Sequence, residues 1–443
     1  MKNKKWFVIG GVIIGLVIIS VFLVIKINKK QEVKDLHIKL EKEWNLTYGE
    51  EITPEMYEDE ELKFTEDDGE HGFNSIDKNN DGYILVGTNE KIKASSSAKQ
   101  GIIEYYDLNG KIKWTKNYPN IDSNNWKVTS AFNDVLAVND GYIVVGYEIG
   151  EEPETENDYN NSFIIKYDLN GNLIWIKKYN RIVSTSNLNN NLSYDFIDVL
   201  SFNEKYYIIG NLTEYEDKEK SENINDSKQY GFVIELDLNG NEISLNKYDE
   251  GSNFITAKVV DNKIIINSIL GYEFINTDES FYWTYDGFEL VSFDGNKFDQ
   301  IIKYFENNEN EISFEDYKDF VVLDGVYYFI SPQTSGDIIA IDKDGNKKFS
   351  TIPKEGDPLL GYWFQKITTD GKNIYVYAYY QEVTSPSLTD AAIIIFDKEG
   401  NYNIVNIGSQ YFSQIVFKDN SLLLPGSENS FAKYKINREN TEK

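Results

Sequence analysis

The sequence contains no cysteine and only two histidines, His37 and His71, among its 443 residues. Without cysteine there can be no disulfide, no thiolate metal site and no cysteine nucleophile. With two histidines, a Ser-His-Asp triad or a multi-histidine zinc site is hard to assemble. Most common designs for metal or nucleophilic catalysis are therefore disfavoured, whereas chemistry based on carboxylates is still open.

Positive charge is also scarce, because 44 basic residues face 73 acidic ones and the net charge is −29. The first 30 residues contain six lysines and no acidic residue, so the rest of the chain carries −35. A body this acidic repels phosphate backbones, and we predict no nucleic-acid partner. Hydrophobic residues make up 41% and aromatic residues 14% of the chain, which is enough to bury a large core.

Residues 6–25 form an uncharged apolar run. Twenty helical residues match the thickness of a hydrocarbon core, so we predict a transmembrane helix over residues 6–27. There is no small-x-small cleavage site, and without cysteine there is no lipoprotein anchor. Lysines flank the run on both sides, so we take the orientation usual for an N-terminal anchor: residues 1–5 in the cytoplasm, and the body on the extracytoplasmic side of a bacterial cell membrane.

Residues 28–59 are predicted to be a juxtamembrane stalk and linker. Apolar residues recur at helical spacing over residues 33–46, at Val33, Leu36, Leu40 and Trp44, which predicts a short amphipathic helix. Pro54 and the acidic residues 58–61 break this periodicity. They mark the entry to the main domain, which we place at residues 60–443.

The main domain repeats itself. One hairpin of aromatic and β-branched runs recurs seven times at intervals of 46–64 residues, with turns at Asp81, Asp140, Glu204, Asp261, Asp324, Asp370 and Asp419. A second hairpin follows most copies and often turns at Asn-Gly, a strong signal for a tight β-turn. Each repeat therefore supplies four antiparallel strands.

Four-stranded repeats of this length indicate an all-β fold, a seven-bladed β-propeller of four-stranded antiparallel blades. The last repeat, residues 412–437, has only three strands. We expect a strand from the N-terminal side, near residues 61–65, to complete it, because closing the ring removes an exposed sheet edge.

Two repeats share the pattern Asp-x-Asn-Gly-x-x-x-Trp, at residues 107–114 and 168–175. This pattern resembles the repeat of PQQ-like, quinoprotein-type bacterial propellers, in which the tryptophan four residues after the glycine packs between blades. Later repeats depart from it, with Ser244, Phe349 and Ile404 at the tryptophan position. The resemblance implies the propeller fold. The family includes assembly scaffolds and quinone-dependent dehydrogenases, and no cofactor-binding motif of the latter can be matched here.

One turn resembles the opening of a calcium-binding EF-hand loop. Asp77, Asn79 and Asp81 have the required spacing and Gly82 follows, but Thr88 stands where the loop needs a bidentate glutamate. The same turn recurs at Asp140 without the upstream ligands, so the repeat itself accounts for the Asp-Gly pair. No cofactor is predicted, and calcium at Asp77, Asn79 and Asp81 is the one metal hypothesis.

Long inserts fall between the second and third strands of the repeats, at residues 91–100, 148–161, 213–229, 271–287 and 381–390. Strand connections in a propeller alternate between its two faces, so these inserts are expected on one face, where binding loops usually lie. Two are rich in acidic residues. The fourth contains six aromatic residues that form either a binding platform or an extra hairpin: Tyr272, Phe274, Phe281, Tyr282, Trp283 and Tyr285.

These patterns predict a membrane-tethered binding or scaffold module that holds a protein, a peptide or a cell-wall polymer on its insert-bearing face. The alternative is an enzyme, either a glycan-active hydrolase with a carboxylate pair or a PQQ-dependent oxidoreductase. A converging carboxylate pair at the channel mouth would favour the hydrolase. The sequence names no such pair among its 73 acidic residues.

Overall fold

The computed structural model describes residues 36–47, 70–93, 96–118, 128–151, 158–180, 192–215, 227–270, 273–276, 281–284, 287–305, 319–331, 336–351, 353, 356–381, 388–408, 410–426 and 430–438. All regular structure in these ranges is β-strand. No helix long and apolar enough to cross a membrane occurs within them. The transmembrane helix predicted from residues 6–25 and the closing strand predicted near residues 61–65 both lie outside the described residues.

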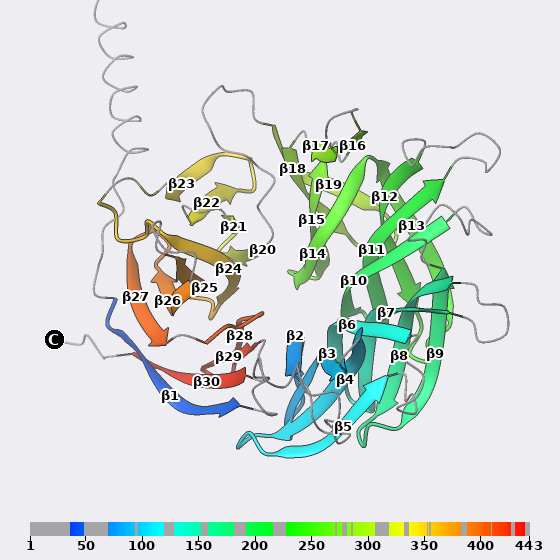
Figure 1. Ribbon diagram of the computed structural model, residues 1–443. Coiled ribbons are helices and arrows are strands. Elements are labelled where there is room, and N and C mark those ends of the chain that lie inside the picture. The colour runs from blue at the N-terminus through cyan, green and yellow to red at the C-terminus, as the bar shows by residue number, and fades with distance from the viewer. Residues whose placement is uncertain are drawn as a thin grey trace, which may run out of the picture.

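Seven four-stranded antiparallel sheets are arranged in a ring, and Figure 1 shows their first strands nearest the centre. The predicted seven-bladed propeller is confirmed. Blade one contains β2 (Glu70–Lys78), β3 (Gly82–Lys93), β4 (Ser96–Asp107) and β5 (Ile112–Tyr118). Blade two contains β6 (Val128–Val138), β7 (Gly141–Glu151), β8 (Asp158–Asp168) and β9 (Leu173–Asn180). Blade three contains β10 (Leu192–Phe202), β11 (Lys205–Tyr215), β12 (Ser227–Leu236) and β13 (Glu242–Glu250).

Blade four contains β14 (Ser252–Val260), β15 (Lys263–Leu270), β18 (Gly287–Phe293) and β19 (Phe298–Phe305), with the small hairpin β16 (Glu273–Asn276) and β17 (Phe281–Thr284) inserted between its second and third strands. Blade five contains β20 (Asp319–Leu323), β21 (Val326–Ser331), β22 (Asp337–Asp342) and β23 (Lys347–Thr351). Blade six contains β24 (Tyr362–Thr369), β25 (Ile374–Gln381), β26 (Leu388–Phe396) and β27 (Tyr402–Gly408).

Blade seven joins the two ends of the described chain. Its strands are β28 (Val416–Lys418), β29 (Ser421–Pro425), β30 (Ser430–Arg438) and, as the outer strand, β1 (Ile38–Thr47). Closure by an N-terminal strand is therefore confirmed, but the segment we predicted for it was wrong. The amphipathic helix predicted over residues 33–46 is also wrong for residues 38–46, which are strand.

The physical reason is that the edge of β30 offers unpaired backbone groups along its length, and a lone helix of this size is marginal in water. Backbone pairing with β30 from Ile38 to Thr47 satisfies that edge. Trp44 then reaches the aromatic rings of Tyr83 in blade one and Phe431 in blade seven, with centroid distances of 6.2 and 4.7 Å. Tertiary contacts thus override a local helical pattern.

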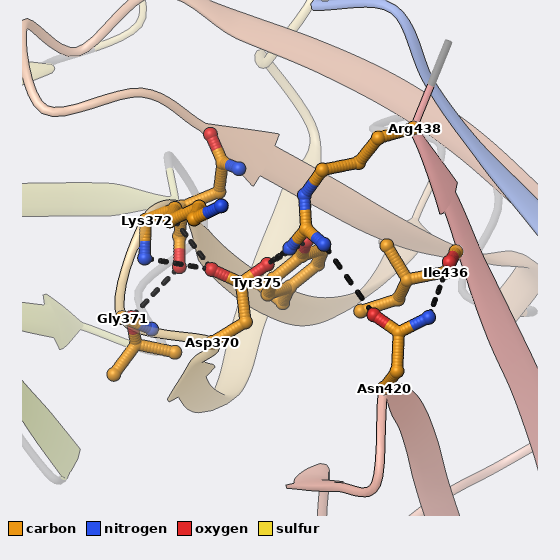
Figure 2. A network of polar contacts seen from close by, with 9 residues as sticks. Asp370, Gly371, Lys372, Tyr375, Asn420, Ile436 and Arg438 are labelled. Carbon is orange, nitrogen blue, oxygen red and sulfur yellow. Dashed lines mark hydrogen bonds and ion pairs between the residues drawn. The ribbon is translucent and has the colours of Figure 1, made fainter. Parts of the chain in front are cut away.

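A polar network fixes the end of β30 to blade six (Figure 2). The Arg438 guanidinium forms an ion pair with Asp370, whose side chain is only 1% exposed. The Tyr375 hydroxyl donates to the same carboxylate at 2.6 Å, and Arg438 also donates to the Asn420 side chain. This network ties the last described strand to the turns of blades six and seven.

The core consists of seven apolar clusters, one at each junction between neighbouring blades. At the junction of blades two and three, for example, Ile143 and Val145 pack against Phe196 and Val199. The cluster between blades seven and one contains Phe431 and Tyr83, with Trp44 against it. Each blade therefore packs against both of its neighbours.

The outer-strand tryptophans lie between blades, as the repeat pattern predicts. Trp114 of blade one lies under the turn of blade two, where its indole Nε1 donates to the Leu169 carbonyl at 3.2 Å. A Cβ added to Gly171, at the centre of that turn, would lie 2.8 Å from the Trp114 ring. The turn can approach the ring this closely only because residue 171 is glycine.

We expect Gly171→Ala to destabilise the protein by about 2 kcal/mol more than Gly345→Ala. Gly171 and Gly345 both have positive φ, 75° and 79°, in equivalent turns, so both variants incur the cost of a left-handed alanine. A Cβ at Gly345 has nothing within 4 Å, whereas one at Gly171 meets the indole. Denaturant unfolding of both variants measures the difference in the free energy of unfolding. Equal losses would show that the close packing of Gly171 on Trp114 does not contribute to stability.

The two faces of the ring differ in the connections that they carry. The turns between first and second strands and between third and fourth strands lie on one face, which we call the turn face. The connections between second and third strands and those between blades lie on the other, the insert face. Ile38, at the start of β1, pairs with Arg438 at the end of β30, so the N-terminal segment reaches the ring on the turn face.

Candidate binding site in the central channel and on the insert face

The central channel is a cavity of about 940 Å³ lined by the first strand of every blade. Five of these strands carry a β-bulge directly after a buried phenylalanine, at Phe73, Phe132, Phe196, Phe254 and Phe364. A bulge re-aims the side chain that follows it. One polar residue from each blade lines the channel, and we call this set the belt: Ser75, Asp134, Asp198, Thr256, Asp319, Lys366 and Gln414.

The belt carboxylates join neighbouring blades. Asp134 accepts a hydrogen bond from the Val199 N–H at 2.9 Å, and Asp198 accepts one from the Ala257 N–H at 2.6 Å. In each case the donor is the first strand of the next blade. Asp319 repeats the contact with the Ile367 N–H at 3.2 Å. These carboxylates are thus part of the architecture of the ring as well as of the channel wall.

Two of them lie in surroundings that disfavour negative charge. Burial raises the pKa of the Asp134 and Asp198 carboxyls above the usual aspartate range, and the charge of Asp198 adds to the rise at Asp134. At Asp198 the hydrogen bond from the Ala257 N–H and the positive charge of Lys366 oppose the rise. Asp319 instead has a cationic partner, because Lys258 Nζ lies 2.8 Å from its Oδ1.

The sequence analysis left open a pair of catalytic carboxylates, and the channel is where such a pair would lie. A hydrolase needs one carboxyl group to give up a proton and another to act as base or nucleophile on the substrate. Asp134 already accepts the Ser75 hydroxyl at 2.5 Å on one oxygen and the Val199 N–H on the other. Those contacts explain the carboxylates as connectors between blades, so the channel by itself does not favour a glycosidase mechanism.

The raised pKa of Asp134 predicts a pH dependence of stability. The pKa of an aspartate in an unfolded chain is about 4. Above that pH, the native protein therefore holds the proton of the Asp134 carboxyl more tightly than the unfolded chain does. The melting temperature should therefore fall as the pH rises from about 4 through the raised pKa. We expect Asp134→Asn to reduce this fall, because it removes the titrating carboxyl. The amide oxygen can still accept the Val199 N–H, and the amide NH2 can donate to the Ser75 hydroxyl, which is the donor in the wild type.

Asp168→Asn is the matched control, because it removes the same charge. The hydrogen bonds from Asn172 lower the pKa of Asp168, so its ionised form stabilises the native state above the unfolded pKa and loses that effect at lower pH. In Asp168→Asn, the melting temperature should fall with rising pH at least as steeply as in the wild type. Thermal melts of the three proteins across this pH range make the comparison, and identical slopes for Asp134→Asn and wild type would contradict the prediction.

The calcium candidates are engaged in the turn and in contacts between blades. Asn79 Oδ1 accepts the backbone N–H groups of Asp81 and Gly82, both at 2.9 Å. Asp77 Oδ2 accepts the Ala137 N–H of blade two at 2.8 Å, and its Oδ1 is paired with Lys418. Within the described ranges, no group of three or more acidic, histidine or cysteine side chains is placed to hold a metal ion. Calcium at Asp77, Asn79 and Asp81 stays a hypothesis.

The aromatic residues of the fourth insert form part of an extra hairpin. Phe274 lies on β16 and is paired with Trp283 on β17, while Phe281 and Tyr282 lie on β17 opposite Asn276 and Ile275. Tyr272 and Tyr285 lie outside the described residues. Of the two arrangements considered from the sequence, a binding platform or an extra hairpin, the backbone forms the hairpin. Binding by this hairpin stays a hypothesis.

Sequence reasoning missed two features of the ring. The first is the belt, which could have been recognised from the repeated phenylalanine followed two positions later by a polar residue, as in Phe132-Asn-Asp134 and Phe196-Ile-Asp198. The second is β1. A tryptophan in an outer strand is the mark of this repeat, and Trp44 is the tryptophan that blade seven lacks in its own C-terminal sequence.

No protein-family model and no curated protein matches the sequence. Among solved structures, BamB from Moraxella catarrhalis, a PQQ-like propeller protein, is similar: identity is 14%, the TM-score is 0.44, and the match covers 90% of this chain and 98% of that one. Raptor from Chaetomium thermophilum has 9% identity and a TM-score of 0.47, with 83% of this chain and 28% of that one covered.

A third similar structure is BBS1N, solved in complex with ARL6DN. It has 10% identity and a TM-score of 0.44, and the match covers 93% of this chain and 99% of that one. The propeller fold that the sequence resemblance implies is shown by the seven four-stranded sheets of the structure itself. At these identities and TM-scores, the likenesses support no conclusion about activity, ligand or partner.

Proposed function

We propose that this chain is a membrane-tethered β-propeller that binds a protein, a peptide or a cell-wall polymer on its insert face, outside the cytoplasmic membrane of a bacterium. The observation that carries the proposal is the position of β1. Ile38 pairs with Arg438 on the turn face, so a tether formed by residues 6–27 would hold that face toward the membrane. The insert face would then be directed away from the bilayer, toward partners.

The shape of the insert face supports the proposal. The second and third strands of blades one to three are 10 to 12 residues long, whereas those of blade five, β21 and β22, have 6 residues each. The long pairs continue the ladder as far as Lys93 opposite Ser96 in blade one, so the inserts there are hairpins that extend the blade. The extended hairpins of blades one to three thus rise above the short blade five on the insert face. This difference in height suits the binding of a partner on one side of the channel.

Site-specific crosslinking in intact cells tests this proposal. A photo-reactive amino acid at Ser96, at the end of the blade-one hairpin on the insert face, is compared with the same amino acid at Asn109, in a turn on the turn face. We expect a discrete adduct with a protein or a cell-wall polymer from Ser96 and none with the same partner from Asn109. The same adduct from both positions, or none from several positions on the insert face, would refute the proposal.

The predicted location needs its own measurement. Protease added to spheroplasts should digest the propeller while leaving a cytoplasmic control protein intact. Protection of the propeller until the cells are lysed would place it in the cytoplasm. The tether and its orientation would then be wrong even if the insert face binds a partner.

A further inference from the structure

Exposed apolar side chains are concentrated on the last turns and outer strands of three consecutive blades. Within the part of the chain that the structure describes, nine large hydrophobic side chains are strongly exposed, and seven of them lie on the last turns and outer strands of blades one, two and three. We call these seven the apolar ridge: Leu108, Ile112, Leu169, Leu173, Ile174, Leu238 and Ile243. Apolar side chains that protrude together on a soluble domain usually mark a contact surface.

The ridge is not a by-product of the repeat. Leu108, Leu169 and Leu238 occupy the same turn position in three consecutive blades, each directly after the turn aspartate. Blades five and six form the same turn with lysine at that position, Lys343 and Lys398, and both lysines are exposed. The turn therefore does not require leucine, and the apolar residues are confined to one arc of the ring.

The ridge is also held rigidly. The Asp168 carboxylate accepts the backbone N–H groups of Asn170 and Asn172, both at 2.8 Å, and the Leu169 carbonyl accepts the Trp114 indole N–H. Asp107 and Asp237 accept the matching N–H groups in their own turns. Because these contacts fix the turns, the leucines are kept exposed and do not fold back onto the blade.

The chain enters the ring beside this arc. Blade seven, which contains β1, packs against blade one, and a Cβ added to Gly110, in the last turn of blade one, would lie 2.8 Å from the Leu46 side chain of β1. Figure 1 shows β1 and β30 side by side along the edge of the ring. Only residues 26–37 separate the apolar run from β1, a length that spans at most about 40 Å.

We infer that the apolar ridge rests in the interfacial layer of the bilayer that anchors the chain, so that blades one to three tilt toward the lipid. This inference depends on the proposed membrane tether. The bilayer is the occupant that the geometry favours, because a tether of this length keeps the turn face near the membrane at all times.

The absence of cysteine allows a direct test with the full chain. Leu169→Cys and Lys343→Cys each carry a single environment-sensitive fluorophore, and both proteins are reconstituted into phosphatidylcholine vesicles that contain a nitroxide-labelled lipid. We expect several-fold stronger quenching at residue 169 than at its counterpart, residue 343. Equal quenching at the two positions in phosphatidylcholine would overturn the inference.

Two controls separate the failure of this inference from the failure of the tether. Flotation of the full chain with vesicles, compared with a chain beginning at residue 31, reports whether the N-terminal segment holds the protein on the membrane at all. Energy transfer between labels at residue 169 on two copies reports whether a second copy covers the ridge. If the chain floats but the ridge is unquenched or shows transfer between copies, the tether stands and the lipid contact is wrong.

Discussion

A chain that begins at residue 48, and so lacks β1, is expected to lose the cooperative unfolding of the intact propeller and to aggregate. Removing β1 exposes the backbone edge of β30 and takes Ile38 and Trp44 away from the apolar clusters on the two sides of blade seven. An uncovered edge strand is a template for pairing with another chain. Thermal unfolding and size-exclusion chromatography measure the effect.

The matched control begins at residue 31, which removes the apolar run and keeps β1. This chain should elute as a folded protein and unfold in a single transition. Had residues 33–46 been a helical stalk outside the ring, the two truncated chains would differ little in stability. Equal melting temperatures for the two would contradict the assignment of β1 to blade seven.

The second large effect is expected for Arg438→Ala, which should destabilise the protein by about 3 kcal/mol, because it leaves the buried carboxylate of Asp370 without its cation. That carboxylate would still accept the Tyr375 hydroxyl and the backbone N–H groups of Lys372 and Asn373. Figure 2 shows that Arg438 also bridges to the turn of blade seven at Asn420, so its loss should loosen the closure of the ring.

A double variant distinguishes charge from packing. Asp370→Asn keeps an oxygen that can accept the two turn N–H groups and removes the buried negative charge, so Asp370→Asn combined with Arg438→Ala should recover much of the lost stability. Denaturant unfolding of the two single variants and the double variant gives the coupling energy. Strictly additive losses would show that the ion pair does not contribute as argued.

The relation between the two largest effects is that both act on blade seven. Among the described blades, blade seven is the one whose sheet combines strands from both ends of the described chain, with Ile38 paired to Arg438. The other six blades are each formed by one continuous stretch of chain. Substitutions at this junction are therefore expected to act on the closure of the whole ring, whereas a variant such as Gly171→Ala acts on a single contact between neighbouring blades.

The candidate site was only partly predictable. The insert face could be assigned from the position of the inserts between second and third strands, since strand connections in a propeller alternate between faces. The belt could not be assigned, because Asp134 and Asp198 are 64 residues apart in sequence and meet only when bulges in two different blades aim them into one channel. Their pKa values are raised by burial, and at Asp134 also by the charge of Asp198.

By itself, the sequence determined the repeat, and with it the number of blades, the strand order within each blade and the glycine turns that lie against tryptophan. These features are local: alternation of apolar residues and a turn such as Asp168-Leu-Asn-Gly171 act over a few residues. The tertiary structure alone decided that residues 38–47 form a strand, because a segment whose apolar spacing suits a helix is stabilised more by the open edge of β30 and the aromatic rings around Trp44 than by its own helical hydrogen bonds.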